Sequence, residues 1–252
     1  FASHEIAGEL DVHNIGSELN IEINRASALS LKNFMNELGA LTGLNPLANE
    51  WIYGKAVAKN YYIENLRAKI DLKDPRPVAE NVSATAYAQD LTIKFQPQIE
   101  AVTVKDANIT LKNDYLSFTL NEPKFKGKSL EGSGVRIGGL FEEKPVVYLD
   151  LRTKESLGKD LIAILQSYGI DEPVYPLGGG IDARVLIDVD VEKESAKVDA
   201  NVTLKDADLM ISKAKFHSKA ARVHITEKKI DIKDANLQNE IFNATASGSI
   251  DI

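Results

Sequence analysis

The sequence predicts a mainly β protein with two short helices, and three observations lead to this fold class. Apolar and polar residues alternate with period two over most of the chain, the alternating runs are long, and the apolar phase changes at short polar segments that suit hairpin turns. In a strand, this alternation places every second side chain on the same face. We therefore expect a largely antiparallel sheet with one apolar face and one polar face.

The longest alternating run covers residues 181–192. Its odd positions, from Ile181 to Val191, are apolar, and its even positions are polar except at Leu186. The run predicts a strand of about eleven residues, which is long beside the usual five or six. The Gly178–Gly180 run and the prolines at 173 and 176 are expected to lie before this strand, as breaks in regular structure.

Shorter alternating runs predict further strands. They lie at Leu91–Phe95, Val102–Val104, Ile109–Leu111, Leu116–Leu120, Val198–Leu204, Val223–Ile225 and Ile230–Ile232, and a long strand is expected to follow Trp51–Gly54 and reach Leu72. Between Leu111 and Leu116 the apolar phase changes across a polar Lys-Asn-Asp segment, as it does at a hairpin turn. Consecutive strands should therefore be neighbours in the sheet.

Two segments have helical period instead. Residues 30–42 carry apolar side chains at Leu31, Phe34, Met35, Leu38 and Leu41, between a possible N-cap at Ser30 and a glycine at 43. Residues 156–168 carry a similar stripe at Leu157, Leu161, Ile164, Leu165 and Tyr168. We expect a short helix at each of these segments, inserted between strands.

An internal repeat relates two distant parts of the chain. Moving residues 107–134 by 114 positions places them on 221–248 without a gap, and apolar positions fall on apolar positions. The repeat units extend over about 84–137 and 200–252. A smaller motif, Asp-Ala-Asn/Asp-Ile/Leu, begins at Asp106, Asp206 and Asp234, and we interpret it as turn chemistry in preference to an ion site.

Composition excludes several classes of function. The net charge of -7 opposes nucleic-acid binding, and the absence of cysteine excludes disulfides, zinc ribbons and thiol catalysis. No window of about 18 uninterrupted apolar residues predicts a membrane span, and the chain begins at Phe1 without a signal-like pattern. We expect the sequence to be part of a longer protein.

No catalytic or metal-binding set emerges from the residues. The histidines at 4, 13, 217 and 224 have no metal-ligand spacing, and Asp188, Asp190 and Glu192 are expected to form a solvated strand face in preference to a Ca²⁺ site. Neither Gly178–Gly180 nor Gly132-Ser133-Gly134 has the context of a phosphate loop or a nucleophile elbow. No cofactor is predicted, and a hydrolase is the least favoured class.

In the order of its elements the chain resembles the AsmA/TamB/YhdP-like bacterial envelope proteins, especially the YhdP-like branch. The resemblance rests on Trp51–Gly54, on Ala86–Phe95 with Pro97, on the strand pairs around Val104–Leu120, and on Gly132–Val135. It continues through Val146–Leu151, the second helix and Gly178–Gly180 before the longest strand. These features are matches of pattern and spacing, and none is a catalytic signature.

The resemblance implies a single elongated β-groove over residues 1–252, a long curled antiparallel sheet with an apolar concave face. It implies a periplasmic section of an inner-membrane-anchored protein that carries phospholipid or another acyl-chain lipid between the two membranes and can contact neighbouring β-groove segments end to end. The candidate groove-lining residues are Leu91, Ile93, Phe95, Ile109, Leu111, Leu116, Phe118, Val185, Ile187 and Val189.

Alternatives to the lipid groove remain open at this point. The same apolar faces could form the dry core of a β-sandwich, since periodicity does not distinguish a covered face from an open one. An all-β scaffold or a polysaccharide-binding envelope module would then be the function.

Overall fold

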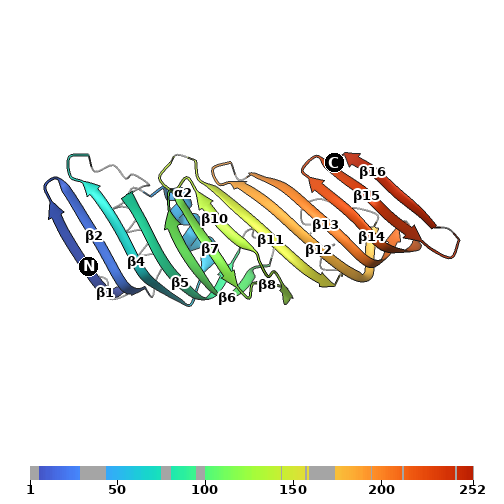
Figure 1. Ribbon diagram of the computed structural model, residues 1–252, viewed down its shortest axis with the longest axis horizontal. Helices are drawn as coiled ribbons and strands as arrows, with labels where there is room; N and C mark the ends of the chain where they lie inside the picture. The colour runs from blue at the N-terminus through green and yellow to red at the C-terminus, as the bar shows by residue number, and fades with distance from the viewer. Residues whose placement is uncertain are drawn as a thin grey trace.

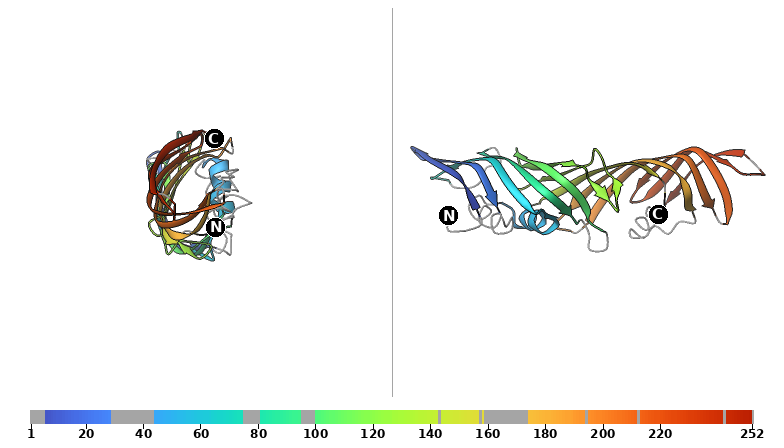
Figure 2. Two further views of the ribbon diagram at one scale, coloured as in Figure 1. Left: turned by 90° about the vertical axis from the view of Figure 1, so that its right-hand side faces the viewer. Right: turned by 90° about the horizontal axis from the view of Figure 1, so that it is seen from below.

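The computed structural model describes residues 6–28, 44–74, 81–94, 100–142, 144–156, 158, 174–193, 195–211, 213–241 and 243–251. These residues form a 16-stranded sheet and, within the described ranges, one helix. The sheet extends along the long axis of the molecule (Figure 1), and seen from its end it curls into an open arc (Figure 2). The predicted curled antiparallel sheet is confirmed, and the described residues do not form a two-sheet sandwich.

The elements follow one another with few insertions. The first half contains β1 (Ile6–Ile15), β2 (Glu18–Ala28), α2 (Pro46–Lys55), β3 (Ala56–Val57), β4 (Asn60–Asp71), β5 (Val82–Ile93), β6 (Val102–Lys112), β7 (Tyr115–Asn121), β8 (Lys124–Phe125) and β9 (Lys128–Ser129). The second half contains β10 (Gly134–Gly138), β11 (Val146–Ser156), β12 (Val174–Asp190), β13 (Ser195–Ile211), β14 (Ala214–Thr226), β15 (Lys229–Gln238) and β16 (Asn243–Asp251).

The topology is a meander. Strands lie in the order β1-β2-β4-β5-β6-β7-β10-β11-β12-β13-β14-β15-β16, and short strands β3, β8 and β9 pair beside this path. Every pair is antiparallel, as expected when each strand follows a hairpin turn. Within the described residues β1 pairs only with β2 and β16 only with β15, so the two ends of the sheet do not meet and the arc stays open.

The β6–β7 hairpin turns where the sequence predicts it. Asn113 and Asp114 have φ values of 50° and 65°, the backbone of a type I′ turn, which matches the twist of the flanking strands. Ile109 pairs with Phe118 in this hairpin, and Val223 pairs with Ile232 in the β14–β15 hairpin. Both positions differ by 114, so the two hairpins share one register, while the wider repeat units remain a prediction.

Single left-handed residues within strands explain where the apolar phase changes. Arg25, Asp90, Asp206 and Asp234 have φ values of 53°, 51°, 45° and 52°, although each lies inside a strand. In β13, even positions up to Leu204 are apolar before Asp206, and odd positions are apolar after it. The predicted turns at Asp206 and Asp234 are therefore wrong: an aspartate tolerates this backbone, and the strand continues through a bulge.

The strand β12 is longer than predicted and ends earlier. It begins at Val174 instead of Ile181 and ends at Asp190, with Glu192 in the following turn. Pro176 and the three glycines are part of the strand. The register against β13 shifts twice along this segment, so the strand continues through irregular pairing. Gly179 has φ +114°, and a Cβ at this position would lie 2.5 Å from the Ala207 Cα, so only glycine allows the two backbones to approach.

The helix α2 lies where the sequence was expected to lead into a strand. Asn45 caps it by accepting hydrogen bonds from the Leu47 and Ala48 amides at 2.8 and 3.3 Å, and Pro46 occupies the first turn. Trp51–Tyr53 are therefore helical, and the long strand begins only at Asn60. The helix has only ten residues, too few for a clear apolar period, and its start is marked only by the Asn45-Pro46 pair. The apolar pattern alone therefore does not identify this helix.

The two helices predicted at residues 30–42 and 156–168 lie outside the described residues, apart from Ser156, which ends β11, and Gly158.

Candidate functional site: an apolar concave face

Cross-strand pairing aligns apolar residues into rows that run from strand to strand. Directly paired residues of an antiparallel sheet point to the same face. One row is Ala26–Ile63–Ala86–Ile109–Phe118–Val135–Leu149–Ile187–Val198, from β2 to β13. A parallel row is Ile23–Leu66–Ala84–Leu111–Leu116–Ile137–Val147–Val189–Ala196. Neither row contains a polar residue.

Further rows extend the same face to the C-terminal edge of the sheet. One is Leu151–Val185–Ala200–Ile225–Ile230–Ile250, and beside it lies Ala183–Val202–Val223–Ile232. Together the rows form an apolar face that continues from β2 to β16. We call it the apolar face below.

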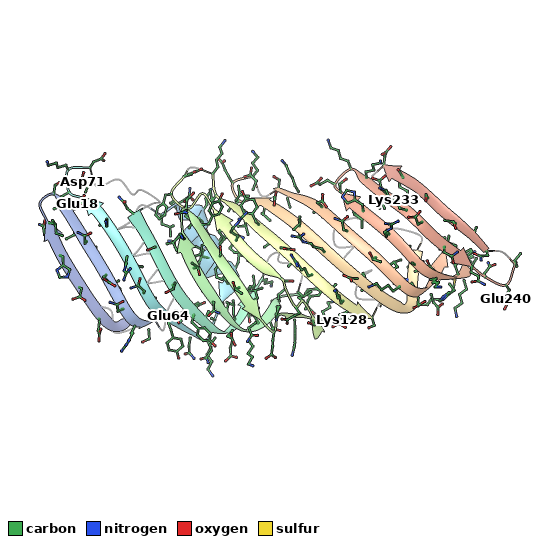
Figure 3. The ribbon with its side chains drawn as sticks, in the orientation of Figure 1. Glu18, Glu64, Asp71, Lys128, Lys233 and Glu240 are labelled. Atoms are coloured by element: carbon green, nitrogen blue, oxygen red, sulfur yellow. The ribbon has the colours of Figure 1, made fainter. Side chains whose placement is uncertain are left out.

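The opposite face is polar in the same registers. Its central row is Asn24–Asn65–Thr85–Thr110–Ser117–Arg136–Tyr148–Asp188–Lys197. The charged side chains Glu18 and Asp71 lie together at one long edge of the sheet, and Lys128 lies at the opposite edge (Figure 3). In the central rows, charged side chains therefore lie on the outer face, at Arg136, Asp188 and Lys197.

The helix α2 identifies the apolar face as the concave one. It lies within the arc of the sheet when the molecule is seen from its end (Figure 2). Its side chains Ala48, Trp51 and Ile52 are buried in the same cluster as Leu91 and Ile137. The apolar rows therefore line the inside of the curl.

The structure brings the predicted lining residues together. Leu91, Ile93, Leu111, Phe118 and Ile187 are buried members of one cluster. Ile109, Leu116, Val185 and Val189 pack against it and are partly buried. Phe95 lies outside the described residues.

Burial divides these residues into two kinds. Leu91 and Ile93 are each only 1% exposed, so protein atoms already cover them. Val185 and Val189 retain partial exposure on β12. A ligand would reach Val185 and Val189 directly, but it would reach Leu91 and Ile93 only after the covering atoms move.

An accessible part of the apolar face lies on β13 to β16, which the predicted site omits. The partly exposed residues there are Val198, Val202, Leu204, Val223, Ile225, Ile232 and Leu237, and Ile250 on the edge strand is 42% exposed. Their period-two alternation is visible in the sequence, but only the pairing shows that they continue the same rows.

Ion pairs and cation–π contacts connect neighbouring strands on the outer face. Asp150 accepts bonds from Arg184 at 2.9 Å and from Arg152 at 2.9 and 3.2 Å, and these bonds lower the pKa of its carboxyl to about 2. Arg136 lies between the rings of Tyr115 and Tyr148, at 4.8 and 4.9 Å from their centroids. These contacts link β7, β10, β11 and β12 on the side away from the apolar face.

In the part of the chain that the structure describes, no group of three or more acidic or histidine side chains is placed to hold a metal ion. The helix found there is too short to cross a bilayer.

The fold and its faces define a class: an open β-groove, a long curled sheet with an apolar inside and a polar outside. The family model described as YhdP protein matches residues 77–252, more than half of the chain. The chain therefore belongs to the YhdP family and, with it, to the envelope proteins of the AsmA-like group. No curated protein and no solved structure matches the chain.

Proposed function

We propose that this chain is a section of a periplasmic lipid-transfer protein, which carries phospholipid along its apolar face between the inner and outer membranes. The single observation that carries the proposal is the continuity of the apolar rows from β2 to β16. A core that served only stability would need a second layer along its whole length. On β13 to β15, however, Val202, Val223 and Ile232 remain partly exposed.

The chemistry of the face suits acyl chains. Each buried CH₂ contributes about 0.8 kcal/mol relative to water, so a continuous apolar surface offsets the contacts that an acyl chain loses when it leaves a bilayer. The charged edges and the open side of the arc leave room for a headgroup to stay hydrated. No catalytic step is part of this function.

The expected setting is the periplasm, within a protein anchored in the inner membrane, with neighbouring β-groove segments as end-to-end contacts. The exposed edge strand β16 supports such a contact, since all of its residues are exposed and its outer backbone groups face no strand among the described residues.

A charge placed on the accessible part of the apolar face tests the proposal. Val202 and Val223 pair directly across β13 and β14, so Val202→Asp with Val223→Asp places two carboxylates on the acyl path. We expect delipidated protein with both changes to lose at least about tenfold in affinity for a fluorescent fatty acid, because burying a carboxylate beside an acyl chain costs several kcal/mol.

The matched control is Asn201→Asp, which adds a carboxylate one residue away on the exposed outer face. It should bind the fatty acid as the unchanged protein does. Equal affinity in all three proteins, with circular dichroism showing intact strands, would contradict the proposal and favour a scaffold or polysaccharide-binding module.

A further inference from the structure

The helix α2 is attached to the sheet at two opposite edges. At its start, the Asn45 amide donates to the Leu140 carbonyl and the Asn45 side chain donates to the Glu142 carbonyl, each at 2.7 Å. At its end, β3 pairs with the last residues of β5, beside Val102 at the start of β6.

The first attachment lies at the other end of β6. The Asp114 carboxylate, in the turn that follows β6, accepts bonds from the Gly139 and Phe141 amides at 2.9 and 3.0 Å. The loop that holds Asn45 is thereby fixed to that turn. Since β6 runs from one long edge of the sheet to the other, α2 crosses the whole width of the apolar face.

Large apolar side chains of the sheet with less than 2% exposure lie near this crossing. Leu91, Ile93, Ile137 and Val147 are 1%, 1%, 0% and 0% exposed. On both sides partly exposed residues lie among buried ones such as Leu66 and Ile187. The partly exposed ones include Leu19, Ile21 and Ile70 towards the N-terminus and Val198, Val223 and Ile225 towards the C-terminus. In Figure 1, α2 lies behind the strands between these two parts.

One feature of α2 opposes its tight docking. Asn49 is 8% exposed, and its Oδ1 has no hydrogen-bond partner among the residues that the structure describes. A buried acceptor without a donor destabilises the docked state relative to one in which water reaches the amide. A leucine at this position would fit an apolar surface better.

We propose that α2 is a removable plug, which divides the apolar face into two acyl-binding stretches and must leave its place before lipid moves from one to the other. This inference rests on the proposed function and adds to it the element that controls passage. The two stretches are β1–β4 and β12–β15, and the covered section is β5–β11.

Photolabelling tests the plug. A diazirine-bearing fatty acid is mixed with the protein, irradiated, and its adducts are mapped by mass spectrometry on three sets of peptides, from β1–β4, β6–β10 and β12–β15. Asn45→Ala removes the cap and the bond to Glu142, and we expect roughly tenfold more adducts on β6–β10. Asn49→Leu should reduce the same adducts, and neither change should alter those on β12–β15.

A covalent bridge provides the opposite state. The chain has no native cysteine, so Leu47→Cys with Glu142→Cys can be linked specifically by a short bis-maleimide that fixes α2 to its loop. Adducts on β6–β10 should fall to background. The control bridge is Asn60→Cys with Gln89→Cys, whose native side chains meet at 3.4 Å on the outer face and do not involve α2.

The outcomes separate the two proposals. Adducts on β6–β10 that persist with α2 bridged would overturn the plug, as would equal labelling in Asn45→Ala and Asn49→Leu. An absence of adducts from every set of peptides would instead overturn the proposed lipid binding, and the plug with it.

Discussion

At the scale of single residues, the outer face depends on a few charged contacts that keep neighbouring strands in register. Asp150 is central to them, because its carboxylate joins Arg152 of its own strand β11 to Arg184 of β12. The arginine side chains are about half exposed, so each ion pair contributes modestly in water. A single carboxylate nevertheless bridges both guanidinium groups and so links the two strands.

Stability should therefore depend on the ionisation of Asp150. Its folded-state pKa, about 2, lies below the ordinary value of 3.8, so its contribution is present above pH 4 and is lost as the pH falls towards 2. We expect Asp150→Asn to lower the free energy of unfolding by about 1 kcal/mol at pH 7. Urea titrations at pH 7 and at pH 2 should show this difference in unfolding free energy at pH 7 and little of it at pH 2. An equal difference at both pH values would contradict a stabilising role for the ionised Asp150.

At the scale of elements, the alternation of the sequence predicts most strands because each strand has one apolar face. The predicted run Leu116–Leu120 falls in β7, and the two runs Val102–Val104 and Ile109–Leu111 both fall in the single strand β6. The prediction fails where a single residue changes the phase without ending the strand. At Asp206 and Asp234 a left-handed backbone and a turn have the same sequence signal, since aspartate suits both.

The bulge of β12 depends on the glycine at position 179. Gly179→Ala places a methyl group against the Ala207 backbone at a φ of +114°, so we expect a loss of at least about 2 kcal/mol in unfolding free energy. Gly178→Ala is the matched control, because nothing lies within 4 Å of its Cβ position. Similar melting temperatures for the two variants would show that the close approach of β12 and β13 is unimportant.

The candidate site was predictable in kind but not in extent. Alternation shows that Val185, Val189 and Phe118 share the chemistry of one face, and the structure places them in one cluster. Pairing registers decide which residues align across strands, and these follow from hairpin and bulge geometry that the residues alone do not determine. The covering of Leu91 and Ile93 could not be foreseen either, since it depends on a helix that the sequence pattern did not predict.

At the scale of the whole molecule, the same alternation has two consequences. Polar rows on the convex face keep the sheet in water, and apolar rows on the concave face extend across consecutive strands. Because each strand adds one more residue to every row, the length of the apolar face grows with the number of strands. A meander of this kind thus forms an extended path from a simple repeated pattern, which suits transfer over a distance better than capture in a closed pocket.

Native mass spectrometry of the protein purified from bacterial cells tests lipid binding most directly. We expect co-purified phospholipid, identified after extraction, that is absent from Val202→Asp with Val223→Asp and retained in Asn201→Asp. Protein that carries no co-purified lipid and does not bind added phospholipid would contradict a lipid-carrying function for the apolar face.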